Sequence, residues 1–465
     1  MKRKVEKTAE LYKVSKDCYH YKEGYHREII SLYIYNPDYD ELQDSDRENL
    51  LRFASSFEYL ETLDVSLYDY RLSDLSFLKK LKYLKSLTLD CDSQFEDLQG
   101  FLHLTELESL YIESSRIKSI EGIERLQKLQ HLAVASSQLK DISPVRKLSA
   151  TLKSINFNSN RIEDISWISS LRHLEYLTFS QNNISEIPDL FNLGNLKEIN
   201  LYHNKIGNIA NLRGLPQLAS INFSDNLIED IGNIRNFTAL ESVYVKSNMI
   251  RDISALSNLE NLVNLDISHN QIKSLSPLKE LSKLNYLSCN RNLIEDLNTF
   301  AFKSQLKFLY ANQCGITRLD FLKNQADVRM LELDDNCINR LPHAIKLKKL
   351  VRLSLRNNTI ENPFPVENFP SLREVDLSGN PFGGKKFSAG SLEPGTALLY
   401  ELSKRGKSAE GLVSAISEGK VSQNSRLKID SDAIFLLIFV LLFFAILIMG
   451  IIVFIGLLIE YSGLP

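Results

Sequence analysis

"LKEINLYHNKIGNIANLRG", residues 196–214, embeds one asparagine, Asn204, in a frame of leucines and isoleucines. The stretch "LASINFSDNLIEDIGNIRN", residues 218–236, repeats this arrangement, and its asparagine, Asn226, comes 22 residues after the first. In both stretches apolar residues stand eight, five and three places before the asparagine and two and five places after it. A fixed period of this length predicts that one small structural unit is stacked many times along the chain.

The asparagine position recurs through most of the chain, and every step of its main series is 22 residues long. That series is Asn160, Asn182, Asn204, Asn226, Asn248, Asn270, Asn292, Cys314, Asn336, Asn358 and Asn380. Toward the N-terminus the steps vary from 22 to 24 residues, and the equivalent positions are Ser137, Ser115, Asp92 and Tyr68. Together these positions predict about fifteen turns over residues 56–381.

The polar residue in the apolar frame has a physical explanation. Two of the apolar residues before each asparagine are two places apart, so a short strand turns both of them toward the interior. The chain must then reverse, and the reversal would bury backbone N–H and C=O groups without partners. An asparagine side chain carries two donor hydrogens and an acceptor, so stacked asparagines can satisfy these groups in turn after turn. We therefore predict that Asn204 and its equivalents are structural rather than ligand-binding residues.

The stretch "LENLVNLDISHNQIKSL", residues 259–275, shows the full pattern L-x-x-L-x-L-x-x-N/C-x-L. Its pattern residues are Leu262, Leu265, Ile267, Asn270, Ile272 and Leu275. On these residues the chain resembles the leucine-rich repeat family, and its 22-residue repeats are similar to those of internalins and of a eukaryotic phosphatase regulator. The resemblance implies an α/β solenoid: a horseshoe of about fifteen turns with a parallel, concave β-sheet.

An array of this kind is stable only when its two ends are capped. Before the repeats, "REIISLYIYN" predicts a strand with Leu32 and Ile34 facing inward, and residues 40–57 predict a helix whose apolar residues are Leu42, Leu50, Leu51 and Phe53. We expect a closing helix at residues 395–405. The predicted division is an N-terminal cap (1–55), the repeats (56–381), a C-terminal cap (382–405), a flexible linker (406–432), a transmembrane helix (433–459) and a short tail (460–465).

Residues 433–459, "AIFLLIFVLLFFAILIMGIIVFIGLLI", contain no charged side chain, and 22 of the 27 are Leu, Ile, Phe or Val. An interfacial helix would need a charged face, which this run lacks. At about 1.5 Å per residue a helix over the run would be about 40 Å long, which crosses a hydrocarbon core of about 30 Å with some tilt. The sequence therefore predicts one C-terminal transmembrane helix.

The charges that flank this run predict its orientation. Lys420, Arg426 and Lys428 come before it, and Glu460 is the only charged residue after it. The positive-inside rule then keeps the repeats in the cytoplasm. With six residues after the span, we expect insertion after synthesis, as a tail anchor. The predicted localisation is a single-pass, tail-anchored membrane protein, in the inner membrane if the host is bacterial.

Composition argues against several other classes of protein. The 55 basic and 58 acidic residues nearly balance, so no overall charge attracts nucleic acid. The cysteines are an odd, scattered set without a C-x-x-C pair, which argues against a zinc site or a disulfide framework and fits a reducing compartment; they are Cys18, Cys91, Cys289, Cys314 and Cys337. Cys314 and Cys337 are expected on adjacent turns.

No set of reactive residues predicts an enzyme. The stretch "GNPFGGKK", residues 379–386, imitates a phosphate-binding loop but has Lys386 where a serine or threonine is required. The eight histidines are dispersed, and His203 and His269 are expected to face solvent on the strands. We predict no catalytic residue, no metal, no cofactor and no small-molecule substrate.

The surface left for function is the concave sheet. Strands about 4.8 Å apart in fifteen turns would form a curved sheet some 65–70 Å long. One outward column is predicted to contain Asn156, Thr178, Asn200, Asn222, Tyr244, Asp266, Ser288, Tyr310, Glu332, Ser354 and Asp376, with an acidic group at its C-terminal end. Tyrosine and arginine often anchor protein interfaces. The candidate partner-binding residues are Tyr176, Tyr202, His203, Tyr244, Lys246, Tyr286, Arg291, Phe308 and Tyr310.

These observations predict a membrane-tethered scaffold that recruits an unidentified protein partner through its concave face. Two alternatives stay open. The chain could be an exported cell-surface receptor, since N-x-S/T triplets at Asn183, Asn222, Asn236 and Asn357 would permit glycosylation. It could also regulate a phosphatase, which only the class of its repeats suggests.

Overall fold

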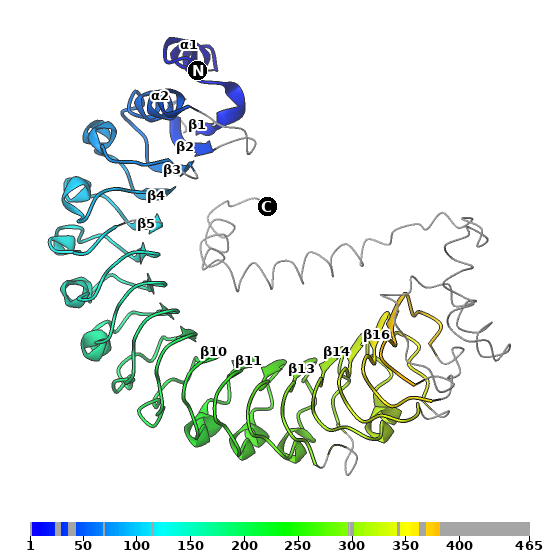
Figure 1. The fold of residues 1–465 in the computed structure, drawn as a ribbon. Coiled ribbons are helices and arrows are strands. Elements are labelled where there is room, and N and C mark those ends of the chain that lie inside the picture. Colours follow the sequence, from blue (N-terminus) through cyan, green and yellow to red (C-terminus); the bar gives the residue numbers. More distant parts are fainter. Residues whose placement is uncertain are drawn as a thin grey trace, which may run out of the picture.

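The repeats form a curved solenoid whose strands line the inside of an arc (Figure 1). The computed structural model describes residues 2–23, 29–35, 43–67, 70–113, 116–295, 297, 302–341, 345–361 and 369–381. The predicted C-terminal cap, linker, transmembrane helix and tail (382–465) lie outside the described residues. Within the described ranges, every helix is too short or too polar to cross a bilayer.

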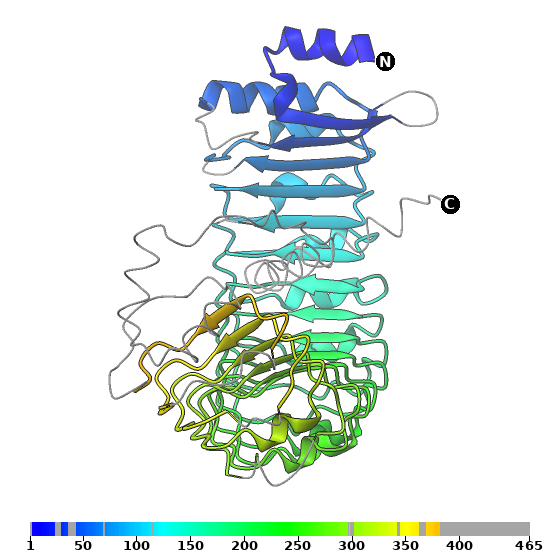
Figure 2. The same cartoon turned by 90° about the vertical axis from the view of Figure 1, so that its right-hand side faces the viewer.

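One sheet of 17 strands runs through the described residues. Strand β1 pairs with β2 antiparallel, and each strand from β2 to β17 pairs in parallel with the next (Figure 2). The strands are β1 (Tyr19–Glu23), β2 (Ile29–Tyr35), β3 (Thr62–Leu67), β4 (Ser86–Cys91), β5 (Ser109–Glu113), β6 (His131–Val134), β7 (Ser154–Asn156), β8 (Tyr176–Thr178), β9 (Glu198–Asn200), β10 (Ser220–Asn222), β11 (Ser242–Tyr244), β12 (Asn264–Asp266), β13 (Tyr286–Ser288), β14 (Phe308–Tyr310), β15 (Met330–Glu332), β16 (Arg352–Ser354) and β17 (Glu374–Asp376). The fifteen strands β3 to β17 correspond to the fifteen predicted turns.

Short 3-10 helices cover the outside of the arc in most turns (Figure 1). Several begin two residues after an aspartate whose carboxylate accepts a hydrogen bond from a backbone N–H; Asp164 Oδ1, for example, accepts from the N–H of Ser166 at 2.7 Å. This local cap ends the preceding segment and starts the helix. The 3-10 helices are η1 (Lys16–Cys18), near the N-terminus, and η2 (Ser76–Lys80), η3 (Gln99–Phe101), η4 (Ile123–Arg125), η5 (Ser143–Leu148), η6 (Ser166–Ser170), η7 (Gly232–Asn236), η8 (Ser254–Asn258), η9 (Ser276–Leu278) and η10 (Asp320–Asn324).

The asparagine position forms the predicted ladder of hydrogen bonds. Asn204 Oδ1 accepts from the backbone N–H of Ile184 in the preceding turn at 3.0 Å. Its Nδ2 donates to the carbonyl oxygens of Phe179 at 2.9 Å and of Leu201 at 3.1 Å. The same set recurs at the equivalent asparagines from Asn160 to Asn380. Since the interior offers these backbone groups no water, the amide is their partner, and the prediction of a structural role is confirmed.

Cys314 interrupts the ladder and changes its bonds. Its thiol donates to the carbonyl oxygen of Cys289 at 3.1 Å, but a thiol does not replace the amide oxygen. The backbone N–H of Ile294 instead bonds to the carbonyl oxygen of Cys314 at 3.2 Å. Asn336, in the next turn, accepts from the N–H groups of both Cys314 and Ile316 at 3.0 Å. Cys314 therefore contacts Cys289 in the preceding turn, whereas Cys337 is exposed.

The residue before each ladder asparagine has a left-handed backbone. His203 and His269 both have φ 55°, and Arg291 has φ 54°. The prediction that the two histidines lie on the strands is therefore wrong, because this conformation belongs to the turn that follows each strand. The first turns lack the asparagine, and their strands are longer, with six residues in β3 and three in β12.

The N-terminal cap contains more structure than was predicted. The strand and the helix of the prediction occur as β2, with Leu32 and Ile34 buried, and as α2 (Asp44–Ala54), with Leu50, Leu51 and Phe53 buried; Leu42 lies outside the described residues. An additional helix, α1 (Lys2–Leu11), and the hairpin strand β1 lie beyond them (Figure 1). Helix α1 buries Val5 and Ala9 against the core. This packing closes the apolar interior that the first repeat would otherwise expose.

Candidate functional site

The register of the sheet confirms the predicted concave column. In parallel pairs, Asn222 lies beside Tyr244, Tyr244 beside Asp266, and Asp266 beside Ser288. The middle residue of each three-residue strand points into the core, so the first and third residues face the open side. A second column therefore runs through the first residues of the strands, and it includes Tyr176, Glu198, Tyr286, Phe308, Met330 and Arg352.

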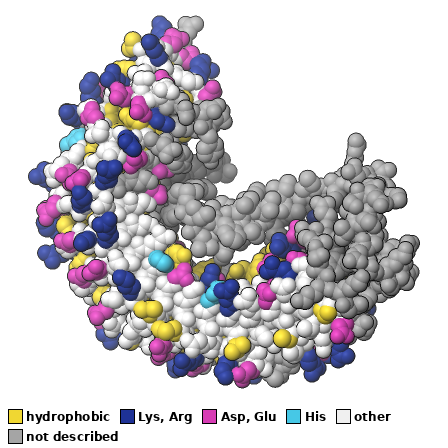
Figure 3. All heavy atoms as spheres, in the orientation of Figure 1, with side chains coloured by type: hydrophobic (Ala, Val, Ile, Leu, Met, Phe, Trp, Pro, Cys, Tyr) yellow, Lys and Arg dark blue, Asp and Glu magenta, His cyan; other side chains and the backbone are white. Residues whose placement is uncertain are grey.

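Four aromatic side chains on β11, β13 and β14 form what we call the concave aromatic patch: Tyr244, Tyr286, Phe308 and Tyr310. The ring centroid of Tyr286 lies 5.4 Å from that of Tyr310 and 6.5 Å from that of Phe308. All four side chains are partly exposed. Figure 3 shows hydrophobic, acidic, basic and histidine side chains meeting along the inner curve of the arc. Strand register brings Tyr286, Phe308 and Tyr310 together on the neighbouring strands β13 and β14, and Tyr244 lies on the same face with one strand, β12, between it and Tyr286.

The surroundings of the patch are poorly solvated. Burial, followed by the nearby Glu332 carboxylate, raises the pKa of Tyr310 to about 12, and Arg352 opposes this shift. The pKa of Tyr286 is raised further, first by burial and then by the Asp266 carboxylate. Each phenol thus stays neutral at physiological pH and presents an intact aromatic ring with a hydroxyl group.

Two carboxylates lie beside the patch on the concave face. Burial raises the pKa of Glu198 on β9 and of Asp266 on β12 above the ordinary values. Asp266 Oδ1 accepts a hydrogen bond from the N–H of Ser268 at 2.9 Å, which opposes the shift, as do the nearby Lys246 and His269. Asp266 stood in the predicted column, but neither carboxylate was among the candidate residues. The 22-residue period was the signal that could have placed Asp266 beside Tyr244, whereas Glu198 lies two strands away from that tyrosine, on β9.

The raised pKa of Asp266 predicts how the stability of the protein depends on pH. A group whose folded-state pKa is raised contributes stability below its unfolded pKa, and this is lost as the pH rises through the folded pKa. The charged carboxylate is therefore unfavourable near neutral pH, and Asp266→Asn should raise the urea midpoint at about pH 7 but leave it nearly unchanged at about pH 3. Urea titration at both pH values checks this. Equal effects at the two pH values would contradict it.

The other candidate residues lie around the patch rather than in it. Tyr202 lies against His203, with ring centroids 5.8 Å apart. The Lys197 ammonium lies 5.9 Å from the ring centroid of Tyr176 on β8. Three other candidates are exposed and lie just after the strands: His203, Lys246 and Arg291. The structure thus places four of the nine candidates in the concave aromatic patch. Of the other five, Tyr176 lies on β8, and the rest lie at the edge of the sheet where the strands end.

The acidic group at the C-terminal end of the column is paired with arginines. Arg352 lies 3.4 Å from Glu332 and 3.3 Å from Glu374. Arg356 lies 3.6 Å from Asp334 and 3.9 Å from Asp335. The expected acidic end is therefore only partly neutralised, since two arginines pair with four carboxylates, and Arg356 is a residue that sequence reasoning did not single out.

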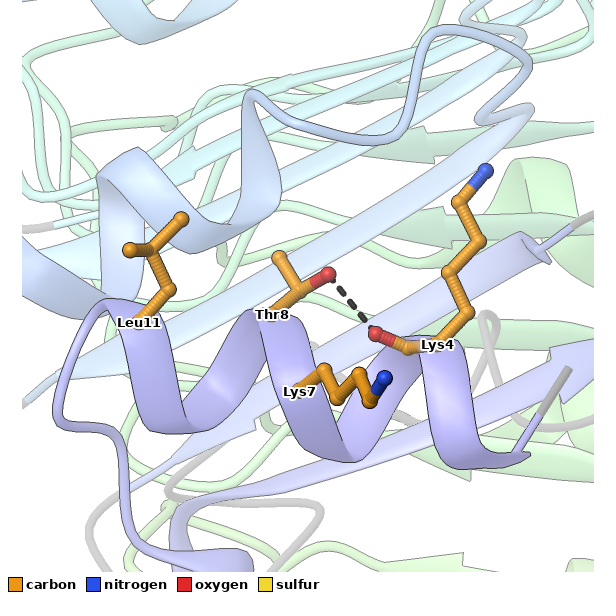
Figure 4. A pocket seen from close by; sticks show the side chains of 4 residues that line it. All are labelled: Lys4, Lys7, Thr8 and Leu11. Carbon is orange, nitrogen blue, oxygen red and sulfur yellow. Dashed lines mark hydrogen bonds between the residues drawn. The ribbon is translucent and has the colours of Figure 1, made fainter.

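Three hollows elsewhere on the described surface are lined by residues other than aromatic ones. Figure 4 shows the one on α1, lined by Lys4, Lys7, Thr8 and Leu11, where the hydroxyl of Thr8 donates to the carbonyl oxygen of Lys4 at 2.7 Å. Another lies on the outside of the arc and includes Leu227, Glu229 and Asp230. Aromatic residues are the commonest anchors of protein interfaces, so the concave aromatic patch is the stronger candidate site.

Part of the chain matches a known family of repeats. The profile described as "Leucine Rich repeats (2 copies)" matches residues 150–192, 172–214 and 260–301. A search of curated proteins finds no match to the chain. The matched residues contain ladder asparagines such as Asn182, Asn204 and Asn270, together with their apolar frame.

Solved bacterial structures share the fold. An internalin, InlF, from Listeria monocytogenes has a TM-score of 0.53 at 21% identity, with 80% of this chain and 94% of that chain covered. The functional domain of InlJ from the same organism has a TM-score of 0.54 at 22% identity, with 65% and 70% covered. The Leptospira interrogans protein LIC12759 has a TM-score of 0.54 at 22% identity, with 70% and 80% covered. The matched segments are therefore leucine-rich repeats, and the described chain has the horseshoe fold of the leucine-rich repeat family.

Proposed function

We propose that this chain is a membrane-tethered scaffold that recruits a protein partner through the concave aromatic patch. The observation that carries the proposal is the patch itself: Tyr244, Tyr286, Phe308 and Tyr310 are clustered and partly exposed on the concave sheet. Tyrosines supply a large apolar ring and a hydroxyl at low cost in conformational entropy, which suits them to anchor an interface. Leucine-rich repeat proteins are in general protein-binding scaffolds or receptors.

The membrane part of the proposal rests on the sequence. Residues 433–459 have the length and composition of a bilayer span, and the basic residues before them favour a cytoplasmic location for the repeats. Confinement beside a membrane would raise the effective concentration of the repeats for a partner on the same membrane without any new contact. Protease digestion of sealed vesicles tests the topology. In vesicles whose cytoplasmic face points outward, digestion of the repeats would support the cytoplasmic location. Protection of the repeats would support the cell-surface receptor instead.

Partner capture tests the role of the patch. The full chain, isolated from native membranes after chemical cross-linking, should recover a partner that the variant Tyr286→Ala/Tyr310→Ala recovers at least about tenfold less, because truncating a tyrosine that is a hot spot of an interface costs about 2 kcal/mol or more. Quantitative mass spectrometry of the recovered proteins measures the ratio.

The matched control changes two tyrosines outside the patch. Tyr59 and Tyr83 are 57% and 51% exposed, and their rings stack with centroids 5.6 Å apart in the turns before β3 and β4. The variant Tyr59→Ala/Tyr83→Ala should keep the partner. If the control variant loses the partner and the patch variant keeps it, the binding surface is on the outer turns and the proposal is wrong.

A further inference from the structure

We infer that the concave aromatic patch binds a positively charged side chain, a lysine or arginine of the partner, between Tyr244 and Tyr286 and against the carboxylate of Asp266. This inference rests on the proposed function and adds the chemistry of the ligand. The ligand class follows from what β11, β12 and β13 place side by side. These strands bring one carboxylate between two electron-rich rings, and cations bind the faces of such rings.

The position of Asp266 is set by the sheet register. Asp266 lies directly beside Tyr244 on β11. On its other side, β13 carries Tyr286 beside Asn264, two residues before Asp266. The Asp266 charge raises the pKa of both Tyr244 and Tyr286 after the larger effect of burial, so the carboxylate lies within electrostatic reach of both phenols.

The charge of Asp266 is not needed by the fold. In its own turn Asp266 Oδ1 accepts from the N–H two residues later. Neutral asparagines do the same in the equivalent position of other turns: Asn222 Oδ1 accepts from the N–H of Ser224 at 3.1 Å, and Asn156 Oδ1 accepts from the N–H of Asn158 at 3.0 Å. Asparagine would therefore serve the turn equally well, and would avoid the cost of a half-buried charge. The turn does not require the negative charge of Asp266, so this charge is available to bind a ligand.

The Asp266 carboxylate has cationic groups nearby but forms no close ion pair with a lysine or arginine of the described chain. Among the described residues, Lys246 and His269 are the cationic groups that lower the pKa of Asp266, and no lysine or arginine of the described chain forms an ion pair with it within 4.0 Å. Glu198 adds a second negative charge near Tyr244, since its charge also raises the pKa of that tyrosine. A partner's cation would thus meet the Asp266 carboxylate and two rings, with the Glu198 charge farther away on β9.

The same sheet already holds a cation on a tyrosine. The Lys197 ammonium lies 5.9 Å from the ring centroid of Tyr176, while it also pairs with Glu175 at 2.7 Å. That arrangement combines a ring and a carboxylate, as proposed for Tyr244, Tyr286 and Asp266.

Selection from a random peptide library provides the test. The library is displayed on phage and panned against the full chain in detergent, and the selected peptides are synthesised with a fluorescent label. We expect them to be rich in lysine or arginine, and Asp266→Asn should weaken their binding about tenfold in fluorescence anisotropy, as the loss of a desolvated charge contact predicts. Replacing the peptide's lysine by norleucine, or its arginine by citrulline, should weaken binding to the wild-type chain by at least as much, and should have a clearly smaller effect on the Asp266→Asn variant, where only the contact with the rings is left to lose.

Matched variants separate the two proposals. Glu229→Gln removes an exposed carboxylate from the outside of the arc and should leave the dissociation constant unchanged. If Tyr286→Ala/Tyr310→Ala abolishes binding but Asp266→Asn does not, the patch binds peptides through other chemistry and this inference is overturned while the proposed function stands. If peptides bind equally well to the wild type and to the tyrosine variant, both proposals fail.

Discussion

The variant Asn226→Leu should lose about 4 kcal/mol of stability, although leucine fits an apolar interior. Asn226 is 6% exposed, and its Oδ1 accepts from the N–H of Ile206 at 3.0 Å. Its Nδ2 donates to the carbonyl oxygens of Leu201 and Phe223, both at 3.0 Å, and of Ser224 at 3.2 Å. Leucine would leave the buried N–H of Ile206 unsatisfied, at about 1–3 kcal/mol. Each of the three carbonyls would keep a second donor but lose one hydrogen bond, at about 0.5–1.5 kcal/mol for each bond.

Urea denaturation of the full chain, followed by circular dichroism, measures the loss. Hydrogen exchange should show the largest loss of protection in the turns that contain Ile206 and Ile228, because repeats interact mainly with their neighbours. The control is Asn233→Leu, since Asn233 is exposed and bonds only to the carbonyl oxygen of Ala210. An unchanged midpoint for Asn226→Leu would show that the ladder does not stabilise the solenoid.

A cysteine in the same position should be tolerated better than leucine. Cys314 occupies this position naturally and donates its thiol hydrogen toward the carbonyl oxygen of Cys289. The variant Asn226→Cys keeps one donor and loses the acceptor, so we expect its stability to lie between those of the wild type and Asn226→Leu. Stability equal to that of the leucine variant would show that the thiol contributes nothing.

The variant Phe179→Ala should lose about 3–5 kcal/mol, the usual cost of removing a fully buried aromatic ring. Phe179 is 0% exposed, and its ring stacks on that of Phe157 in the preceding turn, with centroids 5.6 Å apart and planes 23° apart. Alanine would leave a cavity between two turns, and the flanking ladder bonds from Asn182 and Asn204 to the Phe179 carbonyl would hold the backbone in place. The cavity therefore cannot collapse easily.

The matched control is Phe191→Ala, which makes the same change on the surface. Phe191 is 63% exposed, so its replacement should change stability by less than about 1 kcal/mol. Both variants are compared by urea denaturation under identical conditions. Equal losses would mean that burial of the ring does not determine the effect.

Sequence reasoning reached most of the repeat array and only part of the cap. The period placed every ladder asparagine and the concave column, because each turn repeats the same local interactions. Helix α1 and strand β1 were missed, since residues 2–23 do not follow the repeat period and β1 is held by tertiary contacts: it pairs with β2, and the ring centroid of Tyr19 lies 4.9 Å from that of Phe53 on α2. The backbone of His203 and His269 was also missed. Their left-handed position carries serine, glutamine, aspartate, asparagine and arginine in the other turns of the series and glycine only at Gly379, so the sequence gives almost no glycine signal there.

The sequence by itself determined the solenoid, its period and the residues that fill its interior, because a stacked repeat requires the same apolar and asparagine positions in every turn. Only the tertiary structure decided which surface residues act together. Tyr244, Asp266 and Tyr286 are 20 or more residues apart and meet because parallel strands align them. Register likewise decided that Arg352 and Arg356 pair with four carboxylates of the acidic group. Such neighbours depend on distances between turns, which a linear pattern does not contain.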